Sequence, residues 1–246
     1  MSSLIRPPVP QQYVGMPEPV EPAEVRWDET ARVTVITPTI KGRAAMLERA
    51  KRSVAAQTVP VKHRVIEDTQ GIGPSGIRNR GIEEADTEWV AFLDDDDELY
   101  PEHCEALLRH ADLTGADLIY PWFDLNVQGM IRNESNPLRV GAPDESNLVD
   151  PMGEPVTLAL LKQLDHRNWI PVTLLVRRGA MLTVDGFPQV NSERWPHPDC
   201  EDWACWRDLR DAGFTFAHLP MRTWVWHHHS ANTSGRADRA HQMGLR

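Results

Sequence analysis

Cysteine is scarce in this chain, whose 246 residues include only Cys104, Cys200 and Cys205. Their number is odd and their spacing gives no CxxC pair, so the sequence supports neither a disulfide framework nor a zinc knuckle. Apolar runs are short as well, and none approaches the length of a membrane span. The first residues, MSSLIRPPVPQQY, lack the apolar centre of a signal peptide. We therefore expect a soluble, cytoplasmic protein.

An excess of basic residues is also missing, because 26 Lys and Arg stand against 36 Asp and Glu, for a formal net charge of −10. Dedicated nucleic-acid binders usually present a basic face, so this balance disfavours that class, although a local basic patch is compatible with the sum. An apolar share of 41% and nine tryptophans are enough to build a substantial core. The length suits one large α/β domain or two small ones.

The chain divides into a proline-rich arm and a patterned region. Residues 1–30 hold six prolines and little apolar periodicity, so we predict an arm outside the core. Beyond it, strand and helix patterns alternate. The predicted strands lie in 31–39, where Pro38 ends the β-branched run, and in 62–69, 89–93 and 116–123. The predicted helices lie in 42–58, 101–115 and 200–213. Residues 170–187 are predicted to form a strand followed by a short helix. This alternation favours a mainly parallel, doubly wound sheet, whose ligands collect at the carboxyl ends of the strands.

Two segments are predicted to be irregular. Residues 125–165 are rich in Asn, Gly, Pro and Asp, and we expect a long, loop-rich excursion that includes a hairpin. Residues 71–76, GIGPSG, are glycine-rich but match no phosphate-loop pattern, so we interpret them as an ordinary loop.

Four consecutive aspartates follow the third predicted strand, in EWVAFLDDDDELYP, residues 88–101. Adjacent carboxylates repel one another, so the run is either a solvated turn or a site where a cation collects the charges. A DxD spacing places two carboxylates on one side of the chain and suits one hard divalent cation with the diphosphate that it carries. Because the run lies at the carboxyl end of a strand, we favour the cation over the solvated turn.

Two further features could bind a ligand or a metal. Glu201 and Asp202 begin a predicted helix, where capping and favourable interaction with the helix dipole are the ordinary explanation for an acidic pair. His227, His228 and His229 are adjacent, and along a strand His227 and His229 share one side while His228 faces the other.

Five motifs follow one another along the chain. They are VTVITPT, LERAKRSVAAQT, RNRGIEEADTEWVAFLDDDDELYPEH, the pair DGFP and CEDWACWRDLRDAGF, and HLPMRTWVWHHHSANTS. In this order they resemble the family-2 glycosyltransferases of the GT-A fold, over residues 32–105 and 168–234. The resemblance implies a Rossmann-like α/β domain at 31–234, with a nucleotide-sugar half at 31–123, an acceptor half at 124–234 and a tail at 235–246.

The resemblance also assigns the nucleotide to particular positions. The positions that match residues around the base are Thr37, Pro38, Thr39 and Asp68. Arg80 matches a residue near the ribose or diphosphate. The family often shows Asp-Asp-Gly-Ser after the second strand, whereas this chain has EDTQG, so the base contact and the nucleotide are less defined than the metal site. We expect a uridine nucleotide.

The metal site and the catalytic base are carried over in the same way. Aligning FLDxDD makes Asp94 the nucleotide-side partner and Asp96 the ligand of Mn²⁺ or Mg²⁺, with Asp95 and Asp97 as the rival frame. His229 matches a residue at the metal and diphosphate, and Asp202 matches the catalytic base.

These roles imply an inverting, metal-dependent hexosyl transfer from a nucleotide diphosphate sugar to an acceptor hydroxyl. A divalent ion stabilises the departing diphosphate, and one carboxylate base without a covalent nucleophile fits a single displacement. The acceptor is open between a saccharide, a lipid and a protein, and the net charge disfavours modified DNA. The alternatives are a nucleotidyltransferase, which would usually offer a basic phosphate loop, and a non-catalytic carbohydrate- or protein-binding module.

Overall fold

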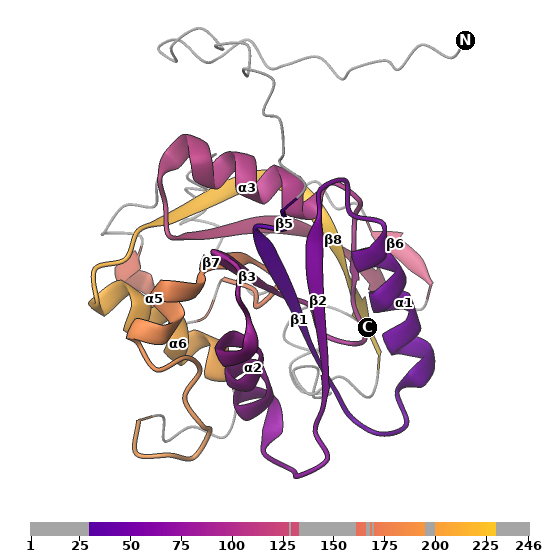
Figure 1. Ribbon diagram of the computed structural model, residues 1–246, viewed down its shortest axis with the longest axis horizontal. Helices are drawn as coiled ribbons and strands as arrows, with labels where there is room; N and C mark the ends of the chain where they lie inside the picture. The colour runs from indigo at the N-terminus through magenta and orange to yellow at the C-terminus, as the bar shows by residue number, and fades with distance from the viewer. Residues whose placement is uncertain are drawn as a thin grey trace, which may run out of the picture.

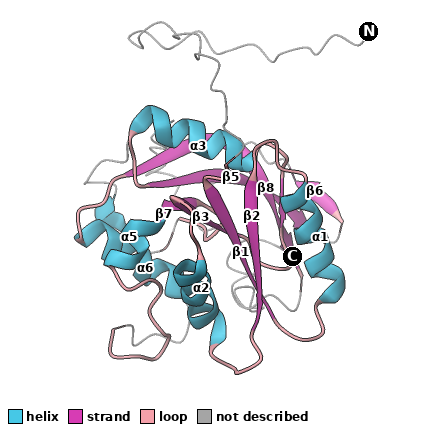
Figure 2. Cartoon of the chain, in the orientation of Figure 1, coloured by secondary structure: helices cyan, strands magenta, loops and turns pink. Residues whose placement is uncertain are grey.

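The computed structural model describes residues 30–127, 129–132, 161–165, 168, 170–194 and 200–229. In this part of the chain, helices flank one mixed sheet on both faces (Figure 1; Figure 2). The predicted N-terminal arm up to residue 29, most of the 125–165 excursion and the C-terminal tail lie outside the described residues. No helix within the described ranges is long and apolar enough to cross a membrane.

The sheet has eight strands, and most of them run in one direction. They are β1 (Val33–Thr39), β2 (Val61–Glu67), β3 (Trp89–Phe92), β4 (Glu98–Leu99), β5 (Leu118–Val127), β6 (Met130–Arg132), β7 (Leu175–Arg177) and β8 (Phe216–His228). Their order is β2-β1-β3-β7-β5-β8-β4, with β6 paired to β5. β1 is parallel to β2 and β3, β7 is antiparallel to both β3 and β5, and β8 is parallel to β5. β1, β2, β3, β5 and β8 therefore share a direction, which confirms the mainly parallel sheet.

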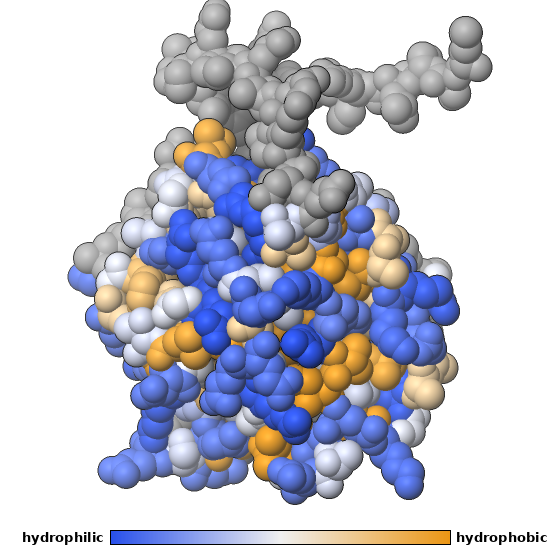
Figure 3. All heavy atoms as spheres, in the orientation of Figure 1, coloured by the Kyte–Doolittle hydropathy of each residue, from blue (hydrophilic) through white to orange (hydrophobic). Residues whose placement is uncertain are grey.

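The helices cover two separate apolar layers, one on each face of the sheet. They are α1 (Ala44–Ala55), α2 (Gly73–Glu84), α3 (His103–Thr114), α5 (Arg178–Thr183) and α6 (Glu201–Asp211), with a short 3-10 helix, η3 (Lys162–Asp165). Alternation along β1 sends Val33 and Val35 to the layer under α1 and α3, and Ile36 to the layer under α2, α5 and α6. On the face seen in Figure 3, hydrophilic residues (blue) surround smaller areas of hydrophobic ones (orange).

The first predicted strand is confirmed, and Pro38 ends only its β-branched run, because β1 continues to Thr39 and Pro38 still pairs with Ile66. The ladder to β3 already stops at Ile36 and Phe92, so the N–H that Pro38 lacks costs no bond to β3.

The GIGPSG segment is not a loop throughout, because α2 begins at Gly73. Pro74 lies at the first turn, where proline favours helix initiation. Gly81 then lets α2 lie close against the sheet: a Cβ there would come 2.5 Å from Cγ2 of Ile36.

The predicted hairpin is confirmed at the start of the 125–165 excursion, where β5 and β6 pair antiparallel. β8 is one strand of 13 residues, and it accompanies β5 through two register shifts. β4 is too short for its pattern to be recognised from the sequence, yet it pairs with the end of β8 and so positions the histidine run.

Candidate active site

The four aspartates form a tight turn between β3 and β4. The Asp97 amide donates to the Asp94 carbonyl at 3.1 Å. Asp95, Asp96 and Asp97 are 2%, 6% and 4% exposed, so the solvated-turn alternative does not hold. Since burial of several like charges is costly without compensation, each carboxylate needs partners nearby.

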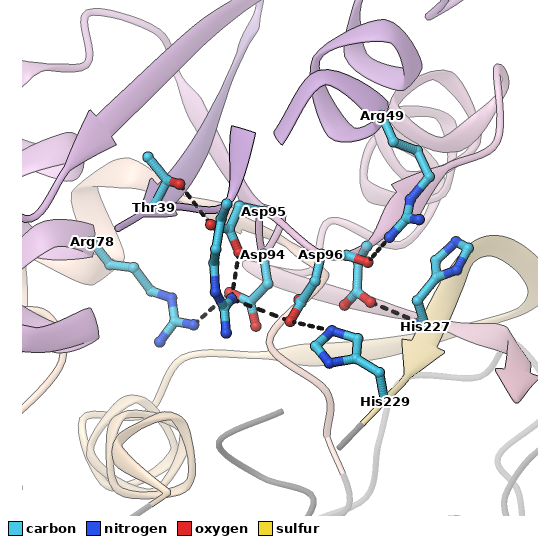
Figure 4. Close-up of polar contacts among 10 residues, drawn as sticks. Thr39, Arg49, Arg78, Asp94, Asp95, Asp96, His227 and His229 are labelled. Atoms are coloured by element: carbon cyan, nitrogen blue, oxygen red, sulfur yellow. Dashed lines mark hydrogen bonds and ion pairs between the residues drawn. The ribbon is translucent and has the colours of Figure 1, made fainter. Parts of the chain in front are cut away.

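Each aspartate has its own partners, drawn from different elements (Figure 4). Asp94 Oδ1 accepts from Arg78 Nη2 at 2.7 Å, and Asp97 Oδ1 accepts from a backbone N–H of β8 at 2.9 Å. Asp95 accepts from Thr39 Oγ1 and from Arg43 Nη1, both at 2.6 Å. These contacts divide the run into carboxylates with separate environments.

Asp96 faces both a cation and a histidine. Its Oδ2 lies 3.3 Å from Arg43 Nη1 and 3.1 Å from His229 Nε2, and its backbone carbonyl accepts from the Arg49 side chain. Burial, and next the charge of Asp94, raise the pKa of Asp96. A positive ion at this carboxylate would offset both causes.

The donor set fits a divalent ion. Asp94, Asp96 and Asp97 each offer a carboxylate oxygen, and these oxygens lie within 4.8 Å of one another. Neighbouring ligand atoms of an octahedral ion with bonds of about 2.1 Å lie about 3.0 Å apart. Asp96 Oδ2 and His229 Nε2 are 3.1 Å apart, which matches that separation. Asp95 is not among the grouped carboxylates, so the geometry favours the Asp94 and Asp96 frame over the rival one.

β8 delivers the histidines from the far end of the sequence. Glu98 and Leu99 pair with Val225 and Trp224, which brings the residues after Val225 beside the aspartate turn. His227 Nε2 lies 3.2 Å from Glu98 Oε2, whereas His229 reaches Asp96. Both rings therefore lie on the acidic side, as strand alternation predicts. The His228 side chain is outside the described residues.

The predicted nucleotide positions lie at the same edge of the sheet but differ in accessibility. Thr39 joins the cluster through Asp95, and its carbonyl accepts from the Asp68 amide at 2.8 Å. Thr37 is fully buried, with its hydroxyl 2.9 Å from His63 Nε2, and only Pro38 of the three is partly exposed. Contact between the Thr37 side chain and a nucleotide is therefore not supported by this geometry.

Asp68 turns its carboxylate onto its own loop. Its oxygens accept from the amides of Gln70, Ile72 and Gly73 at 3.2, 3.0 and 2.8 Å. Desolvation opposes ionisation of Asp68, but these backbone bonds, led by that of Gly73, bring its pKa below the usual value. Asp68 thus fixes the loop that leads into the N-terminus of α2.

Arg80, the arginine predicted near the ribose or diphosphate, lies apart from the aspartates, and Arg78 contacts Asp94 instead. Arg80 is exposed and pairs with Glu84 on the outer side of α2, away from the aspartates. Arg78 is 5% exposed and pairs with both Asp94 and Glu201. The RNRG segment contains both arginines, and its motif position, Arg before Asn, indicates Arg78. Sequence reasoning missed it.

Asn79, next to Arg78, ties α2 to the turn before α6. Its Nδ2 donates to the Phe187 carbonyl at 2.8 Å and its Oδ1 accepts from the Phe187 amide at 2.7 Å. Gly186 lies so close that a Cβ there would come 2.2 Å from Asn79 Oδ1. The backbone of the DGFP motif therefore packs against α2 and is hydrogen-bonded to it.

α6 begins with the acidic pair, and its two members have different partners. Glu201 Oε1 accepts from Arg78 Nη1 at 2.5 Å, which connects this helix end to Asp94 through one guanidinium. Asp202 accepts from Asn168 Nδ2 at 3.0 Å and from the Trp203 amide at 2.8 Å. Burial, and next the charge of Glu201, raise the pKa of Asp202 to about 7. A carboxyl group with this pKa can accept and release a proton near neutral pH.

These features define an α/β domain of GT-A type with an acidic cluster at one edge of its sheet. The model of the family described as "Glycosyl transferase family 2" matches residues 56–157. This match covers 102 of the 246 residues, and together with the fold it is consistent with a family-2 glycosyltransferase of GT-A type.

Two curated proteins are similar to parts of this chain. The succinoglycan biosynthesis proteins ExoW and ExoO of Rhizobium meliloti (strain 1021) are 28% identical over 156 residues and 38% identical over 55 residues. These matches cover 46% and 22% of this chain, and 49% and 16% of ExoW and ExoO. The chain thus spans about half the length of ExoW.

The fold is similar to that of a solved crystal structure. Residues 1–349 of S. aureus TarS, in complex with UDP-GlcNAc, align with a TM-score of 0.61 and 16% identity, covering 87% of this chain and 66% of that one. At this identity, the likeness shows the fold alone.

Proposed function

We propose that the domain transfers a sugar from a uridine diphosphate sugar to an acceptor hydroxyl, with inversion and with a divalent ion, Mn²⁺ or Mg²⁺. The observation that carries this proposal is the acidic edge of the sheet: Asp94, Asp96 and His229 meet there, and Arg78 links Asp94 to the helix end that holds Asp202. The TarS structures with UDP and UDP-GlcNAc support the choice of nucleotide.

Asp96 and His229 would hold the ion, with Asp94 on the nucleotide side. When bound, a divalent ion supplies positive charge against the diphosphate that leaves the sugar. The protein's own part is to keep these ligands in place. β8 presents the histidine, the turn after β3 presents the carboxylates, and Arg78 keeps Asp94 at a fixed distance from α6.

Asp202 is the proposed general base. As the acceptor oxygen bonds to the anomeric carbon, the bond from that carbon to the phosphate oxygen breaks and the hydroxyl proton passes to the Asp202 carboxylate. Asn168 and the Trp203 amide orient that carboxylate. A single displacement of this kind inverts the anomeric carbon.

The acceptor is proposed to be a saccharide. ExoW and ExoO are named for the biosynthesis of succinoglycan, which favours a sugar acceptor over a lipid or a protein. A nucleotidyltransferase would need backbone amides in a loop to bind phosphate. The amides of Gln70, Ile72 and Gly73 already donate to the Asp68 carboxylate, which disfavours this alternative. A phosphate there would have to compete with a carboxylate of the chain itself.

UDP is expected to raise the melting temperature of the protein only when Mn²⁺ or Mg²⁺ is present. The ion would supply positive charge between the acidic edge and the diphosphate, and without it the carboxylates repel the nucleotide. A thermal-shift panel of UDP, GDP, ADP and CDP, each with Mn²⁺ and with EDTA, measures this. Equal stabilisation in EDTA would contradict the metal-bridged site, and a larger response to GDP would correct the base. Release of UDP from UDP-sugars then separates an enzyme from a non-catalytic module.

Replacing His229 by alanine should raise the Mn²⁺ concentration for half-maximal activity by about tenfold or more, because one ion ligand is lost. His227→Ala is the matched control, since its ring faces Glu98 rather than Asp96 and lies two residues away on the same strand. The control should leave the Mn²⁺ dependence within about twofold of the wild type. If the Mn²⁺ dependence of activity were unchanged in His229→Ala, His229 would be a packing residue and not an ion ligand.

A further inference from the structure

Arg43 shares the carboxylate oxygen that the ion would need. This residue precedes α1, and its side chain is 22% exposed. Its Nη1 lies 3.3 Å from Asp96 Oδ2, the same oxygen that lies 3.1 Å from His229 Nε2. A guanidinium therefore already contacts the oxygen at which an ion bound by Asp96 and His229 would sit.

The two contacts of Arg43 differ in strength. Its bond to Asp95 Oδ1 is 2.6 Å long, and the other Asp95 oxygen is fixed by Thr39 Oγ1, also at 2.6 Å. The Asp95 side chain is 3% exposed, so this ion pair is shielded from water. The 3.3 Å contact with Asp96 is long for a charge-assisted hydrogen bond. Arg43 can thus leave Asp96 while Asp95 keeps hold of it.

Electrostatics gives this arrangement a direction. A divalent cation on Asp96 is repelled by a guanidinium a few ångströms away. A diphosphate at the same edge would give the guanidinium another anion to bind, and this contact would replace the one between Arg43 and Asp96. Asp95 does not belong to the group of carboxylates that would hold the ion, and its role would be to keep the Arg43 side chain in place.

We propose that Arg43 is an internal counter-ion of the aspartate cluster, which opposes the divalent ion when it binds alone and favours the nucleotide diphosphate when both bind. The inference rests on the ion site of the proposed function. It makes the ion and the nucleotide bind cooperatively through a residue that is not itself an ion ligand.

The direction of the mutational effects distinguishes this role from a structural one. Arg43→Gln should bind Mn²⁺ alone about three- to tenfold more tightly than the wild type, because the competing charge is removed. With Mn²⁺ saturating, the same variant should bind UDP about tenfold more weakly, because a phosphate partner is lost. Damage to the fold would weaken both.

Isothermal titration calorimetry with Mn²⁺ alone, and with UDP at saturating Mn²⁺, measures both effects without requiring turnover. Arg49→Gln is the matched control. Arg49 lies on α1, pairs with Glu98 and contacts Asp96 at its backbone carbonyl rather than at its carboxylate, so its loss should change Mn²⁺ affinity by less than about threefold. Arg43→Lys keeps the charge and should resemble the wild type in both titrations.

The buried Asp95 loses its cation in Arg43→Gln and could unfold the protein, so the double variant Arg43→Gln with Asp95→Asn is the second test. It keeps the local net charge and the hydrogen-bonding groups, so its gain in Mn²⁺ affinity should have the same direction but be smaller, and its loss of UDP affinity should be the same. Unchanged or weaker Mn²⁺ binding in a folded variant would overturn the role of Arg43 alone. Failure of the wild type to bind Mn²⁺ would overturn the ion site and this inference together.

Discussion

Asp202→Asn is expected to lower the rate of sugar transfer by about 10²–10⁴-fold, while the affinity for UDP with Mn²⁺ stays within about twofold. The substitution removes the proton acceptor and preserves the shape of the side chain. Its amide oxygen can still accept from the Trp203 amide, whereas its amide nitrogen cannot accept from Asn168 Nδ2. Initial rates with a UDP-sugar, together with UDP titrations, separate chemistry from binding.

The raised pKa of Asp202 adds two further signatures. In the wild type, kcat/KM should rise with pH through about 7, because only the ionised carboxylate accepts a proton. In the folded protein, Asp202 binds its proton more tightly than in the unfolded chain, so its contribution to stability is present below the ordinary pKa of an aspartate and is lost as pH rises through about 7. Asp202→Asn should therefore be at least as stable as the wild type at pH 8, by up to about 1–2 kcal/mol.

A control on the same helix tests whether the effect is local. Asp208 is also on α6, and it pairs with Arg194 at the surface. Asp208→Asn should leave the rate within about twofold of the wild type. If Asp202→Asn also turned over at nearly the wild-type rate, Asp202 would serve only as a partner of the Trp203 amide and the base would lie elsewhere.

The strand ends of this fold were predictable because they depend on local pattern. The β-branched run before Pro38 and the apolar run before Asp94 each predict a buried strand, and the alternation with helices predicts a mainly parallel sheet. Parallel strands end at a common edge, so the aspartates and Thr39 had to be neighbours. The 2.6 Å bond between Thr39 and Asp95 follows from that topology, although the sequence alone did not identify that pair.

Other contacts depend on tertiary pairing that no local pattern encodes. β4 has two residues, yet its pairing with β8 is what brings His229 to Asp96 across 133 positions of sequence. The choice between Arg78 and Arg80 depended on which side of α2 faces the core. Burial decides that question, and the weak amphipathic pattern of GPSGIRNRGIEE does not reveal it.

Arg78→Met is expected to destabilise the protein by about 3 kcal/mol, since it leaves two carboxylates without their shared cation. The side chain of Arg78 is 6% exposed, and those of its partners Asp94 and Glu201 are 34% and 13% exposed. The partial exposure of Asp94 keeps the loss at the lower end of the range for a broken buried ion pair. Methionine can still pack on Phe187, which the guanidinium now covers at 5.5 Å, so the loss is electrostatic rather than a cavity.

The neighbouring arginine supplies the control for this prediction. Arg80→Met removes an exposed i,i+4 pair with Glu84 and should change stability by about 0.5 kcal/mol or less. Chemical denaturation of the two variants gives both values. Sugar transfer should fall further in Arg78→Met than its stability loss explains, because Glu201 and with it Asp202 lose their tie to Asp94. Arg78→Lys, which can hold one carboxylate but not both, should recover part of the stability and little of the rate. Equal denaturation midpoints for Arg78→Met and Arg80→Met would show that the buried guanidinium does not connect the two halves of the site.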